Sequence, residues 1–221
     1  MSSQLFLLAY GAVVILSPGI IAYPGEDCSY ITPEEQHEKS PLPYLQDPPT
    51  LDLSIIVPAY NEASRIMPML HVAAEHLQSI PSRSTEILIV DDGSRDNTAA
   101  VVLAMPATYS DRNVQTRKFD LRVISLSKNM GKGAAVKHGF LHARGRRLLM
   151  VDADGASKFS DLELLWKALD EIDVDGHGVA VGSRAHLVNT DAVVKASSIV
   201  CRYYEYGLMT PLLSGRSFGI Y

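Results

Sequence analysis

Residues 51–181 alternate between short apolar runs and longer stretches with helical spacing. The mostly apolar runs lie at residues 53–57, 86–90, 121–126, 147–151 and 178–181. Apolar runs of this length, bounded by turn residues, are typical of buried strands. Between them, residues 62–79, 133–143 and 161–172 have the spacing of helices, and Asp96-Asn97-Thr98 is expected to cap the start of another helix. Strands alternating with helices predict an α/β domain with a mostly parallel sheet, a Rossmann-like arrangement.

A different texture precedes this domain. Residues 2–25 carry no charge, and Leu5–Tyr23 is a stretch of 19 mostly apolar residues, near the length of about 20 needed to span a bilayer. We predict a membrane anchor over residues 1–25. A cleaved signal peptide and a buried helix remain as alternatives, although no Lys or Arg precedes the apolar stretch as a signal peptide would require. Residues 26–50 are rich in proline and polar residues and predict an extended linker.

Polar clusters follow three of the predicted strands. They are Tyr60-Asn61-Glu62, Asp91-Asp92 and Asp152-Ala153-Asp154. Ligands of open parallel sheets bind outside the carboxyl ends of the strands. We therefore expect the three clusters to meet at one edge of the sheet and to form a ligand site there.

The Asp152-Ala153-Asp154 motif offers two carboxylates on one side of an extended chain, because side chains alternate along a strand. Carboxylate oxygens suit Mg²⁺ or Mn²⁺, and one carboxylate could instead hold a ribose hydroxyl. A turn with a helix cap is the plain structural alternative. An EF-hand is disfavoured because Ala156 and Ser157 stand where an oxygen ligand and a glycine are needed. A haloacid-dehalogenase-type phosphatase is disfavoured because it would place the motif on its first strand, whereas here the motif follows about three others.

Basic residues are concentrated between Leu121 and Val151, where seven Lys or Arg occur without any Asp or Glu. Lys128–Gly133 combines glycines and lysines just before a predicted helix, which suits phosphate, although its spacing is not that of a Walker A loop. A solvated basic helix face is an alternative, and Arg144, Arg146 and Arg147 could meet anionic lipid. The net charge of −5 argues against a nucleic-acid partner. Two distant cysteines exclude a disulfide framework.

Taken together, these residues resemble family 2 glycosyltransferases of the GT-A fold, and within them the dolichyl-phosphate β-glucosyltransferases. The resemblance covers about residues 51–195. It is carried by Ser54–Glu62, Val90–Ser94, Lys128–Gly133, Asp152–Phe159 and Gly182–Leu187.

The resemblance implies inverting transfer of glucose from UDP-glucose to dolichyl phosphate, with Mg²⁺ or Mn²⁺, at the cytosolic face of the endoplasmic reticulum membrane. By the same resemblance, a uridine pocket is lined by Pro58, Tyr60, Asn61, Glu62, Asp91 and Asp92. Asp152 would face the ribose or diphosphate, and Asp154 the metal. Lys132 would approach phosphate, and Arg184 the acceptor phosphate.

The resemblance is expected to end near Lys195, which leaves residues 196–221 as a divergent tail. The family pattern continues beyond that point with a segment that this chain lacks. An inactive nucleotide-sugar-binding remnant is therefore an alternative to an active transferase. A related transferase with another sugar donor is a second alternative, because mannosyl and glucosyl relatives share the acidic motifs.

Overall fold

A six-stranded parallel sheet forms the centre of the protein, in strand order β5-β4-β3-β6-β8-β7. The computed structural model describes residues 28–44, 47–80, 82–105, 119–172, 178–182 and 217–220. The strands are β3 (Leu51–Ala59), β4 (Thr85–Asp91), β5 (Asp120–Ser125), β6 (Gly145–Met150), β7 (Val179–Val181) and β8 (Ser217–Ile220). Every neighbouring pair in this sheet is parallel. The predicted α/β class with a mostly parallel sheet is confirmed.

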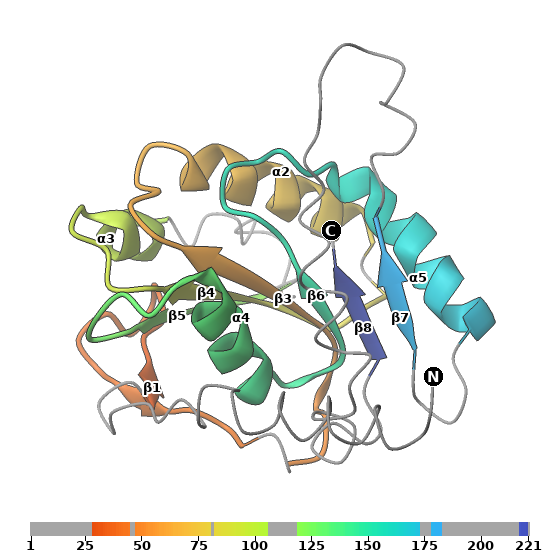
Figure 1. The fold of residues 1–221 in the computed structure, drawn as a ribbon, viewed down its shortest axis with the longest axis horizontal. Helices are drawn as coiled ribbons and strands as arrows, with labels where there is room; N and C mark the ends of the chain where they lie inside the picture. The colour runs from red at the N-terminus through yellow and green to blue at the C-terminus, as the bar shows by residue number, and fades with distance from the viewer. Residues whose placement is uncertain are drawn as a thin grey trace, which may run out of the picture.

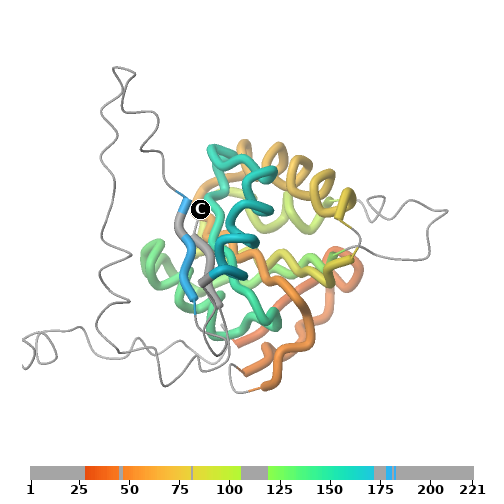
Figure 2. Tube along the Cα trace, turned by 90° about the vertical axis from the view of Figure 1, so that its right-hand side faces the viewer, coloured from red at the N-terminus to blue at the C-terminus, as the bar shows by residue number. Residues whose placement is uncertain are grey.

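Helices cover both faces of the sheet (Figures 1 and 2). They are α2 (Ile66–Ser79), α3 (Thr98–Leu103), α4 (Lys132–Leu141) and α5 (Leu162–Ile172), with a short 3₁₀ helix, η3 (Phe159–Asp161), before α5. Side chains of β3 alternate between two apolar cores: Ile55 packs with α2, α3 and α5, and Ile56 packs with α4. The alternation explains why β3 is buried on both faces.

The order in which strands are added to the sheet reverses at β3. From β3 the chain proceeds outward to β4 and β5, then returns to place β6 on the other side of β3. Pairing of β3 with β6 ends at Ile56 and Met150, followed by one more bond from the Val151 N–H to the Ile56 carbonyl at 3.0 Å. Pro58 lies just beyond and has no N–H to offer. The carboxyl ends of β3 and β6 therefore form the topological switch point, where such sheets bind ligands.

Residues 29–43, which the sequence predicts as part of a linker, contact the domain. β1 (Ser29–Tyr30) pairs antiparallel with β2 (Ser40–Pro41), and Ile31 bridges to Val123 of β5. Leu42 is buried in the core beneath α4, which supplies the apolar contact that holds this segment in place. The predicted anchor at residues 1–25 lies outside the described residues. Within the part of the chain that the structure describes, no helix is long and apolar enough to cross a membrane.

β8 lies between β6 and β7, although its residues 217–220 fall in the predicted divergent tail. Its register places Gly219 opposite Leu149 of β6 and Ala180 of β7. The pair β7 and β8 is seen side by side at the right of Figure 1. Four residues with no helical or turn pattern carry too little signal for a strand to be predicted. The domain boundary at residue 195 stays a prediction.

A buried ion network surrounds Glu86, near the amino end of β4. The Glu86 carboxylate is fully buried and pairs with Arg122, with the backbone N–H of Arg144 at 2.7 Å and with Arg144 Nε at 2.9 Å. It also accepts a hydrogen bond from the Ser54 hydroxyl. Arg144 is thus occupied within the fold instead of facing lipid.

Arg147 is also engaged inside the protein. Its guanidinium stacks 4.1 Å from the centre of the Trp166 ring and pairs with Asp170. Its side chain is 9% exposed. Of the three arginines that the sequence offers to anionic lipid, only Arg146 is exposed.

We expect protonation of His142 to destabilise the fold at acidic pH. Burial lowers the pKa of His142, and the nearby Arg122 charge lowers it further, while the ring Nδ1 lies 2.7 Å from the Pro43 carbonyl oxygen. The unfolded chain therefore binds the proton more tightly, and stability is lost as pH falls below about 6.5. Unfolding titrations at pH 7.5 and 5.5 check this. His142→Gln should flatten the pH dependence by at most about 1.4 kcal/mol per pH unit, and an unchanged slope would contradict it.

Candidate functional site

The loops that follow β3 and β4 are bonded to each other. The Asp92 N–H donates to the Ala59 carbonyl at 2.8 Å, and the Asn61 N–H donates to Ser94 Oγ at 2.9 Å. Asn61 has a positive φ of 57°, a conformation that asparagine tolerates better than most residues. Its side-chain oxygen accepts the Arg95 N–H at 2.8 Å, which holds that conformation. The first two predicted clusters are therefore joined.

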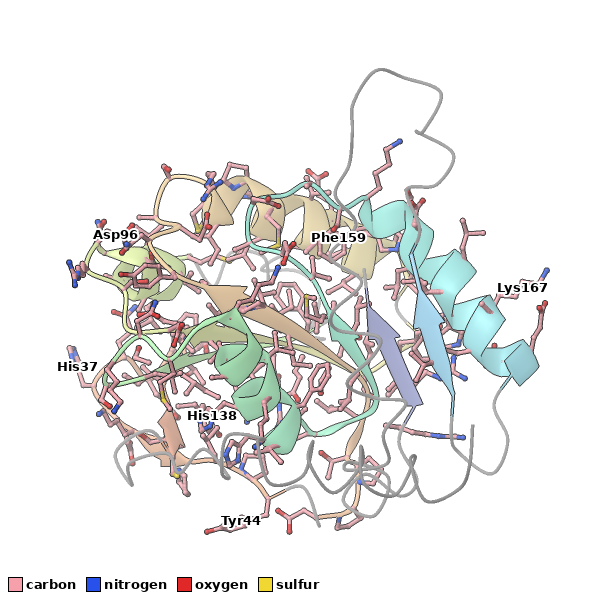
Figure 3. The ribbon with its side chains drawn as sticks, in the orientation of Figure 1. His37, Tyr44, Asp96, His138, Phe159 and Lys167 are labelled. Atoms are coloured by element: carbon pink, nitrogen blue, oxygen red, sulfur yellow. The ribbon has the colours of Figure 1, made fainter. Side chains whose placement is uncertain are left out.

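Three side chains that the sequence does not assign to the site build this junction: Ser94, Asp96 and Thr98. The Glu62 N–H donates to Thr98 Oγ1 at 2.9 Å, and the Ala63 N–H donates to Asp96 Oδ2 at 3.2 Å. Figure 3 shows Asp96 next to α3. The hydrogen bond from the Thr98 hydroxyl lowers the pKa of Asp96.

The predicted helix start at residues 96–98 is confirmed, since α3 begins at Thr98, and the junction gives these residues a second role. The N-cap residue Asn97 makes no side-chain capping bond. Asp96 does accept the Thr98 N–H at 3.0 Å, but its other oxygen and the Thr98 hydroxyl serve the loop after β3. A pattern of capping residues predicts only the local partner, whereas the additional partners, Glu62 and Ala63, lie more than 30 residues away in the chain.

Asp91 and Asp92 are buried beneath this edge. Their exposed fractions are 6% and 2%. Burial raises the pKa of Asp91, an effect that the hydrogen bond from the Ser94 N–H at 3.2 Å opposes. The two oxygens of Asp92 accept the N–H groups of Met130 and Gly131, each at 2.8 Å. Asp92 therefore connects the end of β4 to the loop before α4.

Gly93 allows this loop to approach closely. It has a φ of 65°, and a Cβ added to it would lie 2.6 Å from the Lys128 carbonyl carbon. Gly93→Ala should therefore lower the free energy of unfolding by about 1–3 kcal/mol, through backbone strain and the steric clash. Gly133→Ala is the matched control, because nothing lies within 4 Å of its added Cβ and its φ is not positive. Denaturant titrations that gave equal stability for the two variants would refute the steric argument.

The third cluster faces the helix that precedes β6. Asp152 Oδ1 lies 2.6 Å from the ammonium of Lys132, the first residue of α4. Ala153 is buried, whereas Asp154 is exposed and Asp152 is 39% exposed on its side chain. This alternation agrees with the prediction that both carboxylates face away from the core. Asp154 Oδ1 also accepts the Ala156 N–H at 3.0 Å.

The donor set fits a divalent cation shared with a phosphate ligand. No three His, Cys, Asp or Glu side chains gather into a complete metal cage among the described residues. Mg²⁺ is commonly held by one or two carboxylates together with substrate phosphates and waters, and Asp152 and Asp154 can supply those carboxylates. In the loop after β3, Glu62 Oε1 pairs with Arg65 at 2.7 Å, while its buried Oε2 has no hydrogen-bond partner.

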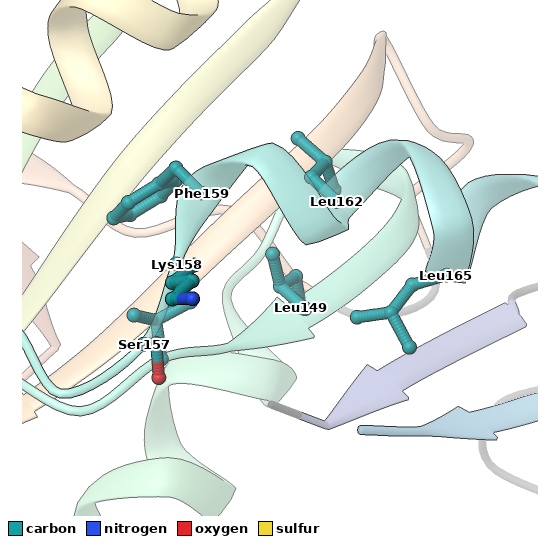
Figure 4. Close-up of a pocket in the computed structure, with 7 residues that line it drawn as sticks. Leu149, Ser157, Lys158, Phe159, Leu162 and Leu165 are labelled. Carbon is teal, nitrogen blue, oxygen red and sulfur yellow. The ribbon is translucent and has the colours of Figure 1, made fainter. Parts of the chain in front are cut away.

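An apolar cavity lies next to the Asp-x-Asp loop and not within the acidic cluster (Figure 4). It is lined by Leu149, Val151, Ser157, Lys158, Phe159, Leu162 and Leu165. Its volume of about 10 Å³ is close to that of a single water probe. Figure 3 shows Phe159 between α2 and α5. A nucleotide cannot enter this cavity, so it is separate from the candidate site.

The structure thus brings the predicted site residues together at the carboxyl edge, with Arg184 outside the described residues. Pro58, Asp91 and Asp92 are buried. Tyr60 (39% exposed), Asn61, Lys132 and Asp154 form an accessible rim around them.

Comparison with known proteins finds several curated relatives that share a name. The chain is 42% identical over 208 residues to dolichyl-phosphate β-glucosyltransferase of Saccharomyces cerevisiae, covering 88% of this chain and 61% of the relative. The Drosophila melanogaster protein of that name is 43% identical over 71% of this chain and 47% of its own length. The human one is 40% identical over 68% and 46%. The resemblance stated from the sequence is confirmed, and the chain spans about half to three-fifths of these curated relatives.

Two solved structures are similar to part of this chain. The mannosyltransferase PcManGT of Pyrobaculum calidifontis, in complex with GDP-Man and Mn²⁺, has a TM-score of 0.47 and 22% identity, covering 80% of this chain and 43% of its own. TarS of S. aureus in complex with UDP-GlcNAc has a TM-score of 0.41 and 26% identity, covering 65% and 37%.

The family itself is defined by a match over most of the described domain. Residues 54–213 match the model of Glycosyl transferase family 2. This stretch includes all the candidate residues and extends past the boundary predicted at residue 195. With the parallel sheet, it supports the expected GT-A fold. The chain belongs to glycosyl transferase family 2.

Proposed function

We propose that this chain binds UDP-glucose at the carboxyl edge of β3, β4 and β6 and transfers the glucose, with inversion, to dolichyl phosphate. The observation that carries the proposal is the linkage of three polar clusters at the topological switch point, through Ser94, Asp92 and the Lys132–Asp152 pair. The names of the relatives support the choice of sugar and acceptor.

In this proposal the donor lies across the accessible rim. The partly exposed Tyr60 would offer its ring to the uracil base, and the buried Asp91 would serve as a hydrogen-bonding group for that base. Lys132 faces the diphosphate, and Asp152 faces the ribose or diphosphate. Asp154 would hold Mg²⁺ or Mn²⁺, which when bound neutralises charge on the leaving diphosphate.

The acceptor needs little activation. A phosphate monoester has its second pKa near ~6, so it is largely dianionic at pH 7 and already nucleophilic. The task of the protein is then to align this phosphate and to exclude competing water. Arg184 is the residue proposed to meet the acceptor phosphate.

The proposed location follows from the acceptor and from the first residues of the chain. Residues 1–25 would anchor the protein in the endoplasmic reticulum membrane, with the folded domain in the cytosol. The uncharged apolar stretch at residues 5–23 and the lipid character of dolichyl phosphate support this placement.

Transfer can be measured directly. The full chain is expressed in membranes that lack endogenous activity, its level is confirmed, and labelled UDP-glucose, dolichyl phosphate and Mg²⁺ or Mn²⁺ are added. We expect a glucosylated lipid that is absent when the metal is chelated. Binding of UDP-glucose without product would support the non-transferring alternative, and product from GDP-mannose alone would reject the glucose donor.

A further inference from the structure

The loop between β5 and α4 is fixed by the turn that follows β4. The Leu126 N–H donates to the Asp91 carbonyl at 2.8 Å, and the Met130 and Gly131 N–H groups donate to the two oxygens of Asp92, each at 2.8 Å. Gly93 completes this contact, since there is no room for a side chain between it and the loop backbone. Both oxygens of Asp92 thus accept hydrogen bonds from one neighbouring loop.

This arrangement differs from the expectation that Asp91 and Asp92 both line the uridine pocket and that the loop at residues 128–133 binds phosphate. Each oxygen of Asp92 already accepts a backbone N–H of the loop, and its side chain, in a residue only 2% exposed, offers almost no surface for a ligand to reach. For the same reason, the N–H groups of Met130 and Gly131 are not available to a phosphate. What remains accessible is the next side chain, Lys132, which is 58% exposed.

We call the two hydrogen bonds from the Met130 and Gly131 N–H groups to Asp92 the clamp. Lys132 links this clamp to the candidate site. Its backbone begins α4 directly after the two clamped residues, and its ammonium lies 2.6 Å from Asp152. A lysine side chain on a long flexible stem points reliably at one partner only when its backbone is held. The sequence of contacts therefore runs from Asp92, through the backbone of residues 130–131, to Lys132 and Asp152.

We propose that Asp92 is a positioning residue, which holds the Lys132 ammonium beside Asp152 and the donor diphosphate without contacting the donor itself. The inference rests on the proposed function for the identity of the donor. It assigns different tasks to the two adjacent aspartates, with Asp91 at the donor and Asp92 at the loop.

A double-mutant cycle on binding of UDP-glucose tests this assignment in the full chain. Asp92→Asn keeps the shape, but its amide nitrogen cannot accept a hydrogen bond, so one buried N–H loses its partner. We expect Asp92→Asn to weaken binding about 10-fold in the natural chain and less than about 2-fold in a Lys132→Ala background. In the control background Lys137→Ala, on the same helix, the full 10-fold effect should return. Equal effects in all three backgrounds would overturn the proposal.

Hydrogen exchange in the ligand-free chain provides a readout that does not depend on the donor. Asp92→Asn should speed exchange at the amides of Met130 and Gly131 by about 10-fold or more, with the amides of β4 unchanged. Unchanged exchange at residues 130–131 would overturn the positioning role. Faster exchange together with no binding of UDP-glucose by the natural chain would instead reject the proposed donor, and would leave the clamp established.

Discussion

Replacing Asp154 by Asn should reduce glucosyl transfer by about 100- to 1000-fold, which corresponds to several kcal/mol of lost charge stabilisation at the leaving diphosphate. Asp154 is the more exposed member of the Asp-x-Asp pair, and its Oδ1 is already oriented by the Ala156 N–H. An amide in its place keeps the shape but removes the negative charge that a divalent cation requires. The initial rate of lipid glucosylation at saturating metal measures the effect.

Glu171→Gln is the matched control for this variant. Glu171 is an exposed residue of α5 and lies outside the candidate site. Its replacement also removes one carboxylate, so it reports on any general dependence on net charge. Transfer by Asp154→Asn within 3-fold of that by Glu171→Gln, on the order of a 0.6 kcal/mol difference, would remove Asp154 from the proposed metal site.

Replacing Glu86 by Gln should destabilise the fold by about 3–5 kcal/mol. Glu86 is fully buried, and the side chain of its partner Arg122 is only 3% exposed. Burial lowers the pKa of Arg122, against the opposing effect of the Glu86 charge. Without that charge, the guanidinium stays buried with no adequate counterion, and Arg144 loses one of its two carboxylate partners.

The comparison for Glu86 is an ion pair near the surface. Arg83 pairs with Glu163 through two bonds of 2.6 and 2.8 Å, and the Glu163 side chain is 44% exposed. Glu163→Gln should cost no more than about 1 kcal/mol, because solvent screens the pair. Urea titrations that placed the two variants at the same midpoint would contradict the importance assigned to the buried network.

The sheet and the position of the site could be predicted because their signals are local. Short, β-branched apolar runs such as residues 53–57 and 86–90, bounded by turn residues, are typical of buried strands. Once the strands are parallel, the clusters that follow them must share an edge. The close approach of Lys132 to Asp152 agrees with the expectation that both face one ligand.

The remaining features depend on contacts between distant residues. Arg144 and Arg147 read as free charges in the sequence, yet Glu86 and Asp170 pair with them. The segment around Leu42 has the proline content of a linker, although Leu42 is buried in the core beneath α4 and Ile31 bridges to Val123. Nothing local distinguishes Asp91 from Asp92, since their difference arises from a loop nearly 40 residues later.

Binding of UDP-glucose to the full chain in the presence of Mn²⁺ is the most direct test of the site at the carboxyl edge. Calorimetric titration should show one site per chain, loss of binding when the metal is chelated, and at least a 10-fold weaker affinity for Asp154→Asn, or about 1.4 kcal/mol. Competition by UDP but not by GDP is expected from a uridine pocket. Binding that persisted unchanged in Asp154→Asn, or no binding by the natural chain, would contradict the site described here.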